Sequence, residues 1–168
     1  MKKSLMAAAL MAALSGGAFA QGYAGVDVGS TKINEVGSAT GFGLYGGYAF
    51  SKTMAVELGY RKLGTWDFVE PGLGTAELDG SSIQLSGLFG AEISEGYVAF
   101  VRLGVNQLKA KATARVGNAS ATASDSESKF LWGLGLDAKF TDSVSGRVEY
   151  QKPASDTGTI SLGVKFGF

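Results

Sequence analysis

Residues 160–168 read ISLGVKFGF, with an apolar side chain at every second position. Alternation with a period of two predicts a β-strand with one apolar face, because successive side chains of a strand point to opposite faces. In a soluble protein such a face packs against a core, and in a transmembrane barrel it faces lipid. The strand ends on Phe168, at a chain end where a soluble protein usually frays. The rest of the sequence decides between the two settings.

The same alternation predicts further strands along the whole chain. Each candidate holds roughly ten residues or more, the length that a tilted membrane-crossing strand requires. Together they predict an all-β protein with eight antiparallel strands. The expected strands are residues 22–33, 40–50, 54–64, 79–93, 97–110, 128–140, 144–153 and 158–168.

The connections differ in length at the two ends of these strands. Residues directly opposite in an antiparallel hairpin face the same side, so the apolar residues that flank a turn should lie opposite each other. This requirement predicts three-residue loops at 51–53, 94–96 and 141–143. The other connections are longer and polar, above all 64–76 and 111–127. Short turns at one end and long loops at the other are typical of outer-membrane barrels. The expected opposing pairs are Phe50 with Met54, Ile93 with Tyr97, and Phe140 with Val144.

The face opposite the apolar one carries mostly glycine. The chain has 26 glycines and 2 prolines, and many of the glycines share the parity of the charged residues. A water-facing outer surface would carry many Lys and Glu, whereas the crowded interior of an eight-stranded barrel requires small residues. We therefore expect an eight-stranded antiparallel up-and-down transmembrane β-barrel with its apolar face toward lipid. A soluble lipocalin-like barrel with reversed faces is the alternative.

The first twenty residues have the plan of a secretory signal peptide. Lys2 and Lys3 precede an apolar run at 5–14, and the sequence AFA ends at Ala20. The apolar run is too short to span a bilayer as a helix, which needs about 20 residues. We expect residues 1–20 to be the signal peptide and residues 21–168 to be one barrel domain in the outer membrane of a Gram-negative bacterium.

Composition excludes several classes of function. The chain has no Cys and no His, which removes the usual zinc ligands and the usual general base of a Ser or Cys nucleophile. Lys and Arg number 15 and Asp and Glu number 15, so no basic surplus favours nucleic acid. The GFGLYG at 41–46 matches a nucleotide-binding pattern, but it continues as a strand and opens no helix. We expect no enzyme and no catalytic, cofactor or metal site.

Four stretches resemble a known family. These are AVELGY at 55–60, FVRLGV at 100–105, GRVEYQ at 146–151 and the last nine residues. They resemble the transmembrane domain of outer membrane protein A and related small, porin-like barrels, over essentially all of 21–168. The resemblance implies Phe168 as the signal for the barrel assembly machinery, outer-membrane lipids and lipopolysaccharide as partners, and a monomer. The sequence stops at the barrel, so a peptidoglycan-binding domain and a cell-wall tether are not expected.

In several strands, charged residues stand at the alternate positions that face the barrel interior. We expect six of them to form one layer. Asp137 and Arg147 are equidistant from the centre of the 141–143 loop, which predicts a direct cross-strand pair. In the resembling barrel, inward acids and bases form an ionic network that plugs or gates the interior. Two positions depart from that pattern, since Leu88 and Asp27 stand where an inward Lys is expected. The six residues are Asp27, Glu57, Arg102, Asp137, Arg147 and Glu149.

Three interpretations of these charges are open. They can fill and fix the barrel, because buried charges must be paired whether or not they have a function. They can line a gated path for water or ions. A carboxylate pair such as Glu57 with Glu149 can also do acid and base chemistry, although no substrate cleft is indicated.

Two aromatic residues stand in the 65–77 connection. Trp66 and Phe68 can belong to the aromatic belt at the membrane boundary, or they can anchor a partner outside the cell. The function expected first is a structural role in envelope integrity. The alternatives are a small gated pore, and an adhesin or receptor that acts through the second and third outer loops.

Overall fold

The computed structural model describes residues 21–34, 36–70, 74–116 and 119–168. The predicted signal peptide, residues 1–20, lies outside the described residues. Among those that are described, no helix is long and apolar enough to cross a membrane.

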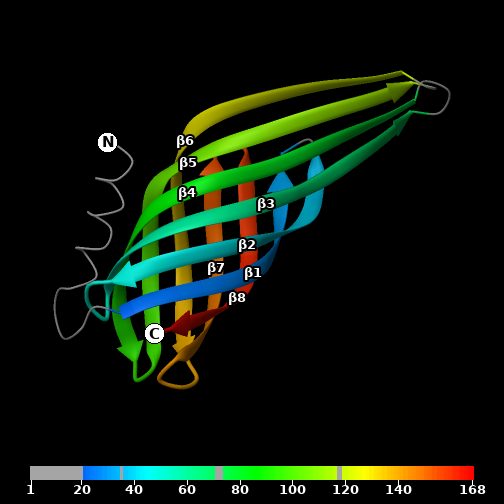
Figure 1. The fold of residues 1–168 in the computed structure, drawn as a ribbon. Coiled ribbons are helices and arrows are strands. Elements are labelled where there is room, and N and C mark those ends of the chain that lie inside the picture. Colours follow the sequence, from blue (N-terminus) through cyan, green and yellow to red (C-terminus); the bar gives the residue numbers. More distant parts are fainter. Residues whose placement is uncertain (1–20, 35, 71–73, 117–118) are drawn as a thin grey trace.

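Within the described residues, eight antiparallel strands follow one another around a closed barrel (Figure 1). Each strand pairs with the next along the chain, and β8 pairs with β1, so the up-and-down topology is confirmed. The strands are β1 (Gln21–Ile33), β2 (Gly37–Ala49), β3 (Met54–Glu70), β4 (Gly74–Ser94), β5 (Tyr97–Val116), β6 (Ala119–Lys139), β7 (Val144–Ala154) and β8 (Thr157–Gly167).

The C-terminal strand is held by the first strand. Gly167 lies opposite Tyr23, and the backbone N–H of Phe168 donates a hydrogen bond to the carbonyl of Gly22 at 2.9 Å. Closure leaves no free edge on β8, because each of its neighbours supplies hydrogen bonds. The last strand is therefore paired to its end, and the Phe168 side chain itself is exposed.

The apolar face of the barrel points outward. The side chains of Leu134, Leu162 and Phe130 are 52%, 62% and 62% exposed, and large apolar side chains are exposed on every strand. The inward positions on the same strands hold glycine and buried polar residues. Such a surface suits lipid, so the transmembrane prediction is confirmed and the soluble alternative is wrong.

Two of the three predicted short turns have the expected register. The N–H groups of Phe50 and Phe140 donate to the carbonyls of Met54 and Val144, both at 2.9 Å.

The expected pair of Ile93 with Tyr97 is wrong. Ser94 pairs with Tyr97, and the register shifts between Glu92 and Ser94. Gly96 has a φ of 79°, a left-handed conformation that glycine adopts freely, and this permits a shorter turn with an irregularity before it.

The prediction of long loops at 64–76 and 111–127 is wrong. The strands β3 to β6 continue through most of these residues and project together beyond the other four (Figure 1). The polarity of these residues is typical of loops, but their side chains continue to alternate between the two faces. Pairing between adjacent strands supplies hydrogen bonds to the backbone N–H and C=O groups. We call this part the projecting sheet. It comprises the described parts of residues 64–82 and 107–129.

Candidate functional site

Charged side chains from five strands meet inside the barrel. All but two of them are almost fully buried, and the side chains of Asp137 and Lys165 are 14% and 20% exposed. We call this cluster the interior network. Its members are Tyr23, Glu57, Arg102, Asp137, Arg147, Glu149 and Lys165.

Glu57 on β3 is the centre of the interior network. Its Oε1 lies 2.5 Å from Nη2 of Arg102, and its Oε2 lies 2.7 Å from Nη1 of Arg147. The Tyr23 hydroxyl also donates to Oε2 at 3.0 Å. Both carboxylate oxygens therefore have charged or polar donors, as a carboxylate removed from water requires.

Arg102 on β5 joins Glu57 to Glu149 on β7. Its Nε donates to Glu149 Oε1 at 2.5 Å and its Nη2 to Oε2 at 3.0 Å. Two parallel bonds of this kind fix the planar guanidinium against the carboxylate. Among the described residues, Arg102 is the one ion-pair partner of Glu149.

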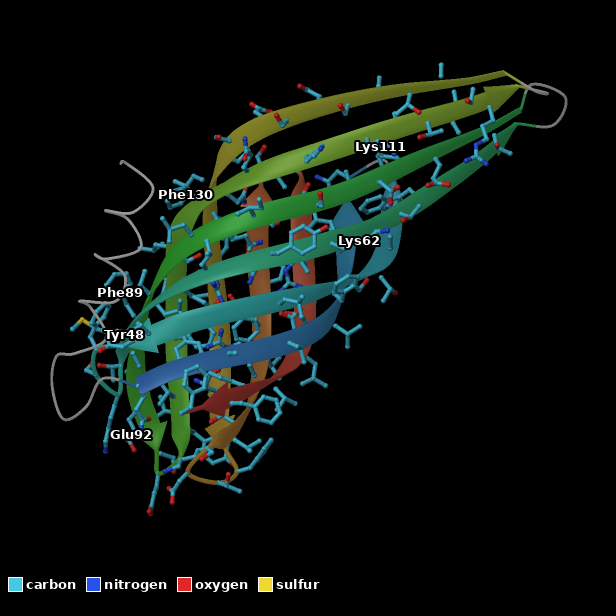
Figure 2. All side chains as sticks on the ribbon, in the orientation of Figure 1. Tyr48, Lys62, Phe89, Glu92, Lys111 and Phe130 are labelled. Atoms are coloured by element: carbon cyan, nitrogen blue, oxygen red, sulfur yellow. The ribbon has the colours of Figure 1, made fainter. Side chains whose placement is uncertain are left out.

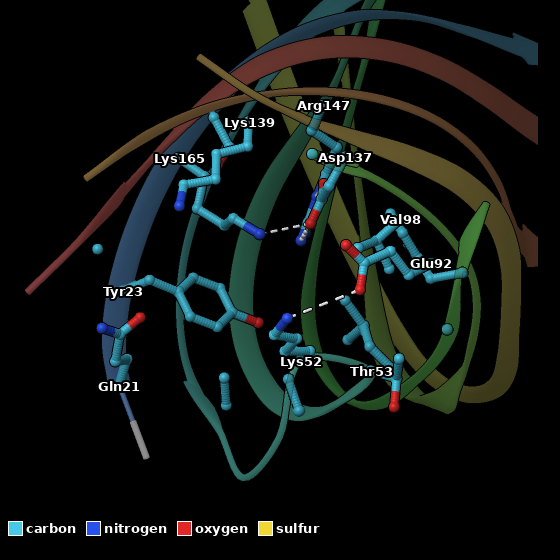
Figure 3. A pocket seen from close by; sticks show the side chains of 18 of the residues that line it. Gln21, Tyr23, Lys52, Thr53, Glu92, Val98, Asp137, Lys139, Arg147 and Lys165 are labelled. Carbon is cyan, nitrogen blue, oxygen red and sulfur yellow. Dashed lines mark hydrogen bonds and ion pairs between the residues drawn. The ribbon is translucent and has the colours of Figure 1, made fainter. Parts of the chain in front are cut away.

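Arg147 extends the interior network toward the end of the barrel that carries the short turns. Its Nε and Nη2 donate to Asp137 at 2.7 and 3.1 Å, and the two residues are directly opposite in the register, as expected from the sequence. The guanidinium lies between the rings of Tyr45 and Phe100, with Cζ 4.9 and 4.8 Å from their centroids. The ammonium of Lys165 binds the same carboxylate, Asp137 (Figure 3).

The interior network is electrically balanced. Its three carboxylates face three cations, two guanidinium groups and one ammonium. Buried charges are stable only when they are paired and hydrogen-bonded, and removing one partner leaves the other uncompensated. The network therefore behaves as one rigid, neutral unit.

Asp27 is not part of the expected layer. It binds Arg61, with two hydrogen bonds of 2.7 Å between the guanidinium and the carboxylate. The two residues lie on β1 and β3, and Gly43 on the intervening β2 is opposite both. Because Gly43 has no side chain, Arg61 can reach across β2 to Asp27.

The barrel interior contains further layers between the charges and its outer end. Gln84 donates to Ser82 and to Gln151, at 3.1 and 3.3 Å, and Thr31 hydrogen-bonds Thr159. Buried apolar side chains on β3 and β6 also line the interior. They are Leu63, Trp66 and Leu131, with Leu131 fully buried.

Trp66 does not face lipid, so the expectation that it belongs to the aromatic belt is wrong. It is 5% exposed, and its Nε1 donates to the carbonyl of Gly37 at 3.3 Å. The register of β3 shifts between Lys62 and Gly64, which reverses the parity of the residues that follow. Its burial also leaves Trp66 unavailable to a partner, and the side chain of Phe68 lies outside the described residues.

Three members of these clusters were not among the expected site residues. Arg61 and Lys165 have the inward parity, and that parity was the signal that could have placed them. Tyr23 has the same parity, but an aromatic residue gives no charge signal.

A cavity of about 900 Å³ opens at the end of the barrel that carries the short turns. Lys165, Asp137 and Arg147 line it, so the interior network faces this cavity from within (Figure 3). At its rim, Lys139 donates to Asp142 at 2.7 Å, and this hydrogen bond holds the pKa of Asp142 below its usual range. Across the part of the chain that the structure describes, no group of three or more Asp and Glu is placed to hold a metal ion.

Solved structures with this fold include outer-membrane proteins and designed transmembrane β-barrels. Ail, the attachment invasion locus protein of Yersinia pestis, solved with the heparin analogue sucrose octasulfate, is 21% identical, with a TM-score of 0.62 over 89% of this chain and 97% of Ail. Neisserial surface protein A is 17% identical, with a TM-score of 0.62 over 88% and 97% of the two chains. The N-terminal barrel of OprF from Pseudomonas aeruginosa is 16% identical, with a TM-score of 0.58 over 89% and 99%. Identities this low show the fold alone.

The sequence itself matches a family model. No curated protein sequence matches the chain significantly. The model of the OmpA-like transmembrane domain matches residues 16–165, nearly the whole chain. The resemblance expected from the sequence is thereby confirmed. This chain belongs to the family of OmpA-like transmembrane domains, outer-membrane barrels with eight strands.

Proposed function

We propose that this protein is a non-conducting outer-membrane barrel with a structural role in the envelope. The observation that carries the proposal is the neutral interior network, which joins β1, β3, β5, β6, β7 and β8 across the barrel. A network of this kind ties distant strands to one another and occupies the space that a channel would need.

Two further observations argue against a gated pore. Leu88 is buried opposite Arg102 on β4, where the resembling barrel has a Lys that could serve as a second partner. Without that cation, β4 offers Glu57 no alternative ion pair. Leu131 is also fully buried, two residues nearer the outer end than Gly133, which lies opposite Arg102, and apolar side chains inside a pore exclude water and ions.

We expect the folded protein to be silent in a planar bilayer. The measurement is single-channel recording of the refolded protein, with folding verified by the difference in gel mobility between boiled and unboiled samples. A porin of known conductance, recorded in the same bilayers, is the positive control. Discrete openings by the wild type that change in an Arg147→Ala variant would contradict the structural role and favour the pore.

A second candidate function is binding outside the cell through the projecting sheet. The observation that favours it is the length of β3 to β6, which continue beyond the other strands (Figure 1). Envelope integrity alone requires no such extension. Among the neighbours, Ail is an attachment invasion locus protein.

Shortening the projecting sheet tests this second function. Residues 68–76 and 112–123 can be replaced by two-residue turns that keep the buried Trp66, because Asp67 pairs with Glu77 and Lys111 pairs with Ser124. We expect the shortened protein to fold, since the barrel registers are kept, and to lose the attachment of producing bacteria to host cells. Attachment equal to that of the full-length protein would exclude the sheet as the binding element.

A further inference from the structure

An open hollow of about 550 Å³ lies on the lipid-facing surface of the barrel, over β1, β2 and β3. Its floor contains Ala24 and Gly46, which lie directly opposite each other on β1 and β2. Larger outward side chains surround this floor, so the hollow is lined almost entirely by hydrocarbon. We call these side chains the rim, and they are Val26, Leu44, Leu58, Tyr60, Ile83 and Phe166.

The glycine in the floor differs from other glycines on the outward face. The side chain of an aromatic residue covers four of those, so a methyl group added there would meet a ring. At Gly46, an added Cβ would meet no described atom nearer than the carbonyl oxygen of Tyr23, at 3.7 Å. A glycine inside a strand often marks a place where another molecule approaches closely. The covered glycines are Gly22, Gly87, Gly146 and Gly158, under Phe168, Phe89, Phe140 and Tyr150.

The floor of the hollow lies in the half of the membrane next to the short turns. Ala24 and Gly46 each hold the second outward position from that end of their strands. Figure 2 shows Tyr48, the first outward residue of β2, at the short-turn end, and Lys62, which follows the rim residue Tyr60, toward the projecting sheet. The short turns of outer-membrane barrels face the periplasm. Phospholipid forms the leaflet on that side, whereas lipopolysaccharide forms the outer leaflet.

The shape of the hollow favours a flexible chain over a second barrel. Two convex barrel surfaces meet at their projecting side chains, so a second copy would touch the rim and leave the floor empty. A stable protein interface also buries roughly 1,200 Å² or more, and two convex surfaces share only a narrow strip. An empty hollow lacks the dispersion contacts that its lining could make. A single hydrocarbon chain can supply them, because it can lie between the rim side chains.

We propose that this hollow holds one acyl chain of a phospholipid from the periplasmic leaflet. The methylene groups of the chain pack against Ala24 and Gly46, and the rim holds the chain on both sides. Lipid tails are as apolar as leucine, so close packing gives the preference for this site and the hydrophobic effect does not. The inference goes beyond the envelope and attachment roles proposed above and depends on neither.

Native mass spectrometry tests this site. The refolded protein is released from detergent micelles that contain phosphatidylethanolamine, after its folding is verified by gel mobility. We expect the wild type to retain one phospholipid per chain. Gly46→Leu fills the floor and should fold, because an added Cβ has room there. The retained fraction should fall by about three- to fourfold, the effect of losing roughly five carbon–carbon contacts.

Ala24→Leu and Ala99→Leu are a matched pair of variants. Ala99 also holds the second outward position from the short-turn end of its strand, β5, but it does not line the hollow. Ala24→Leu should lower retention as Gly46→Leu does, and Ala99→Leu should retain phospholipid like the wild type.

Four results would overturn the proposal. Equal losses in Ala24→Leu and Ala99→Leu would mean that the hollow has no special role, as would a wild type without bound phospholipid. A two-chain mass that Gly46→Leu abolishes would assign the hollow to a second copy of the chain. Retention of lipopolysaccharide in place of phosphatidylethanolamine, when both are offered, would assign it to the outer leaflet.

Discussion

Replacing Arg102 with methionine should destabilise the folded barrel by about 3 to 5 kcal/mol, the usual effect of leaving a buried charge without its partner. Glu149 would lose the one ion-pair partner that it has among the described residues, while 2% of its surface is exposed. Glu57 would keep Arg147 and Tyr23. The measurement is urea unfolding in lipid vesicles, followed by tryptophan fluorescence and by gel mobility.

The double variant Arg102→Met, Glu149→Met separates the ion pair from the volume it fills. This variant removes the Glu149 carboxylate that would otherwise be left without a partner. It should recover most of the lost stability, since replacing a whole buried pair by apolar residues is often neutral. Lys52→Met is the control for an exposed pair with Glu92, and its effect should stay below about 1 kcal/mol. If the single and double variants lose equal stability, the pairing with Glu149 contributes nothing and the rigid-network interpretation fails.

Parity was sufficient to predict the barrel and its faces. The alternation in β8 and its counterparts depends on the two-residue repeat of a strand, which any lipid-facing barrel must keep. The pair of Asp137 with Arg147 followed from the same rule, because a short turn fixes the register on both sides of it.

The alternation rule failed where one extra residue interrupted the two-residue repeat of a strand. The shift between Lys62 and Gly64 placed Trp66 inside the barrel, and no composition signal marks such a shift. Asp27 was assigned to the wrong cluster, because its partner depends on Gly43 in the strand between them, a contact across three strands. The projecting sheet was missed because its Ser, Thr and Ala residues have the composition of loops, and only pairing with neighbours orders them.

Replacing Leu134 with arginine should be as damaging as breaking the interior network. Leu134 is 52% exposed on the outward face of β6, midway between Phe130 and Ala138, so an arginine there would stand near the centre of the bilayer. A charge at that depth of a barrel surface destabilises by about 2 to 4 kcal/mol. Unfolding in vesicles of known thickness measures the difference from the wild type.

Ser128→Arg is the matched control, because it introduces the same side chain on the same face of β6, six residues nearer the outer end. Near the interface a charge has an effect of about 0 to 1 kcal/mol, and beyond it the guanidinium is in water. The stability difference between the two variants therefore measures depth in the bilayer, and not the loss of a leucine or the gain of a charge. A Leu134→Arg protein that inserts and unfolds like Ser128→Arg would mean that this face is not in lipid, which would overturn the assignment of the outward surface.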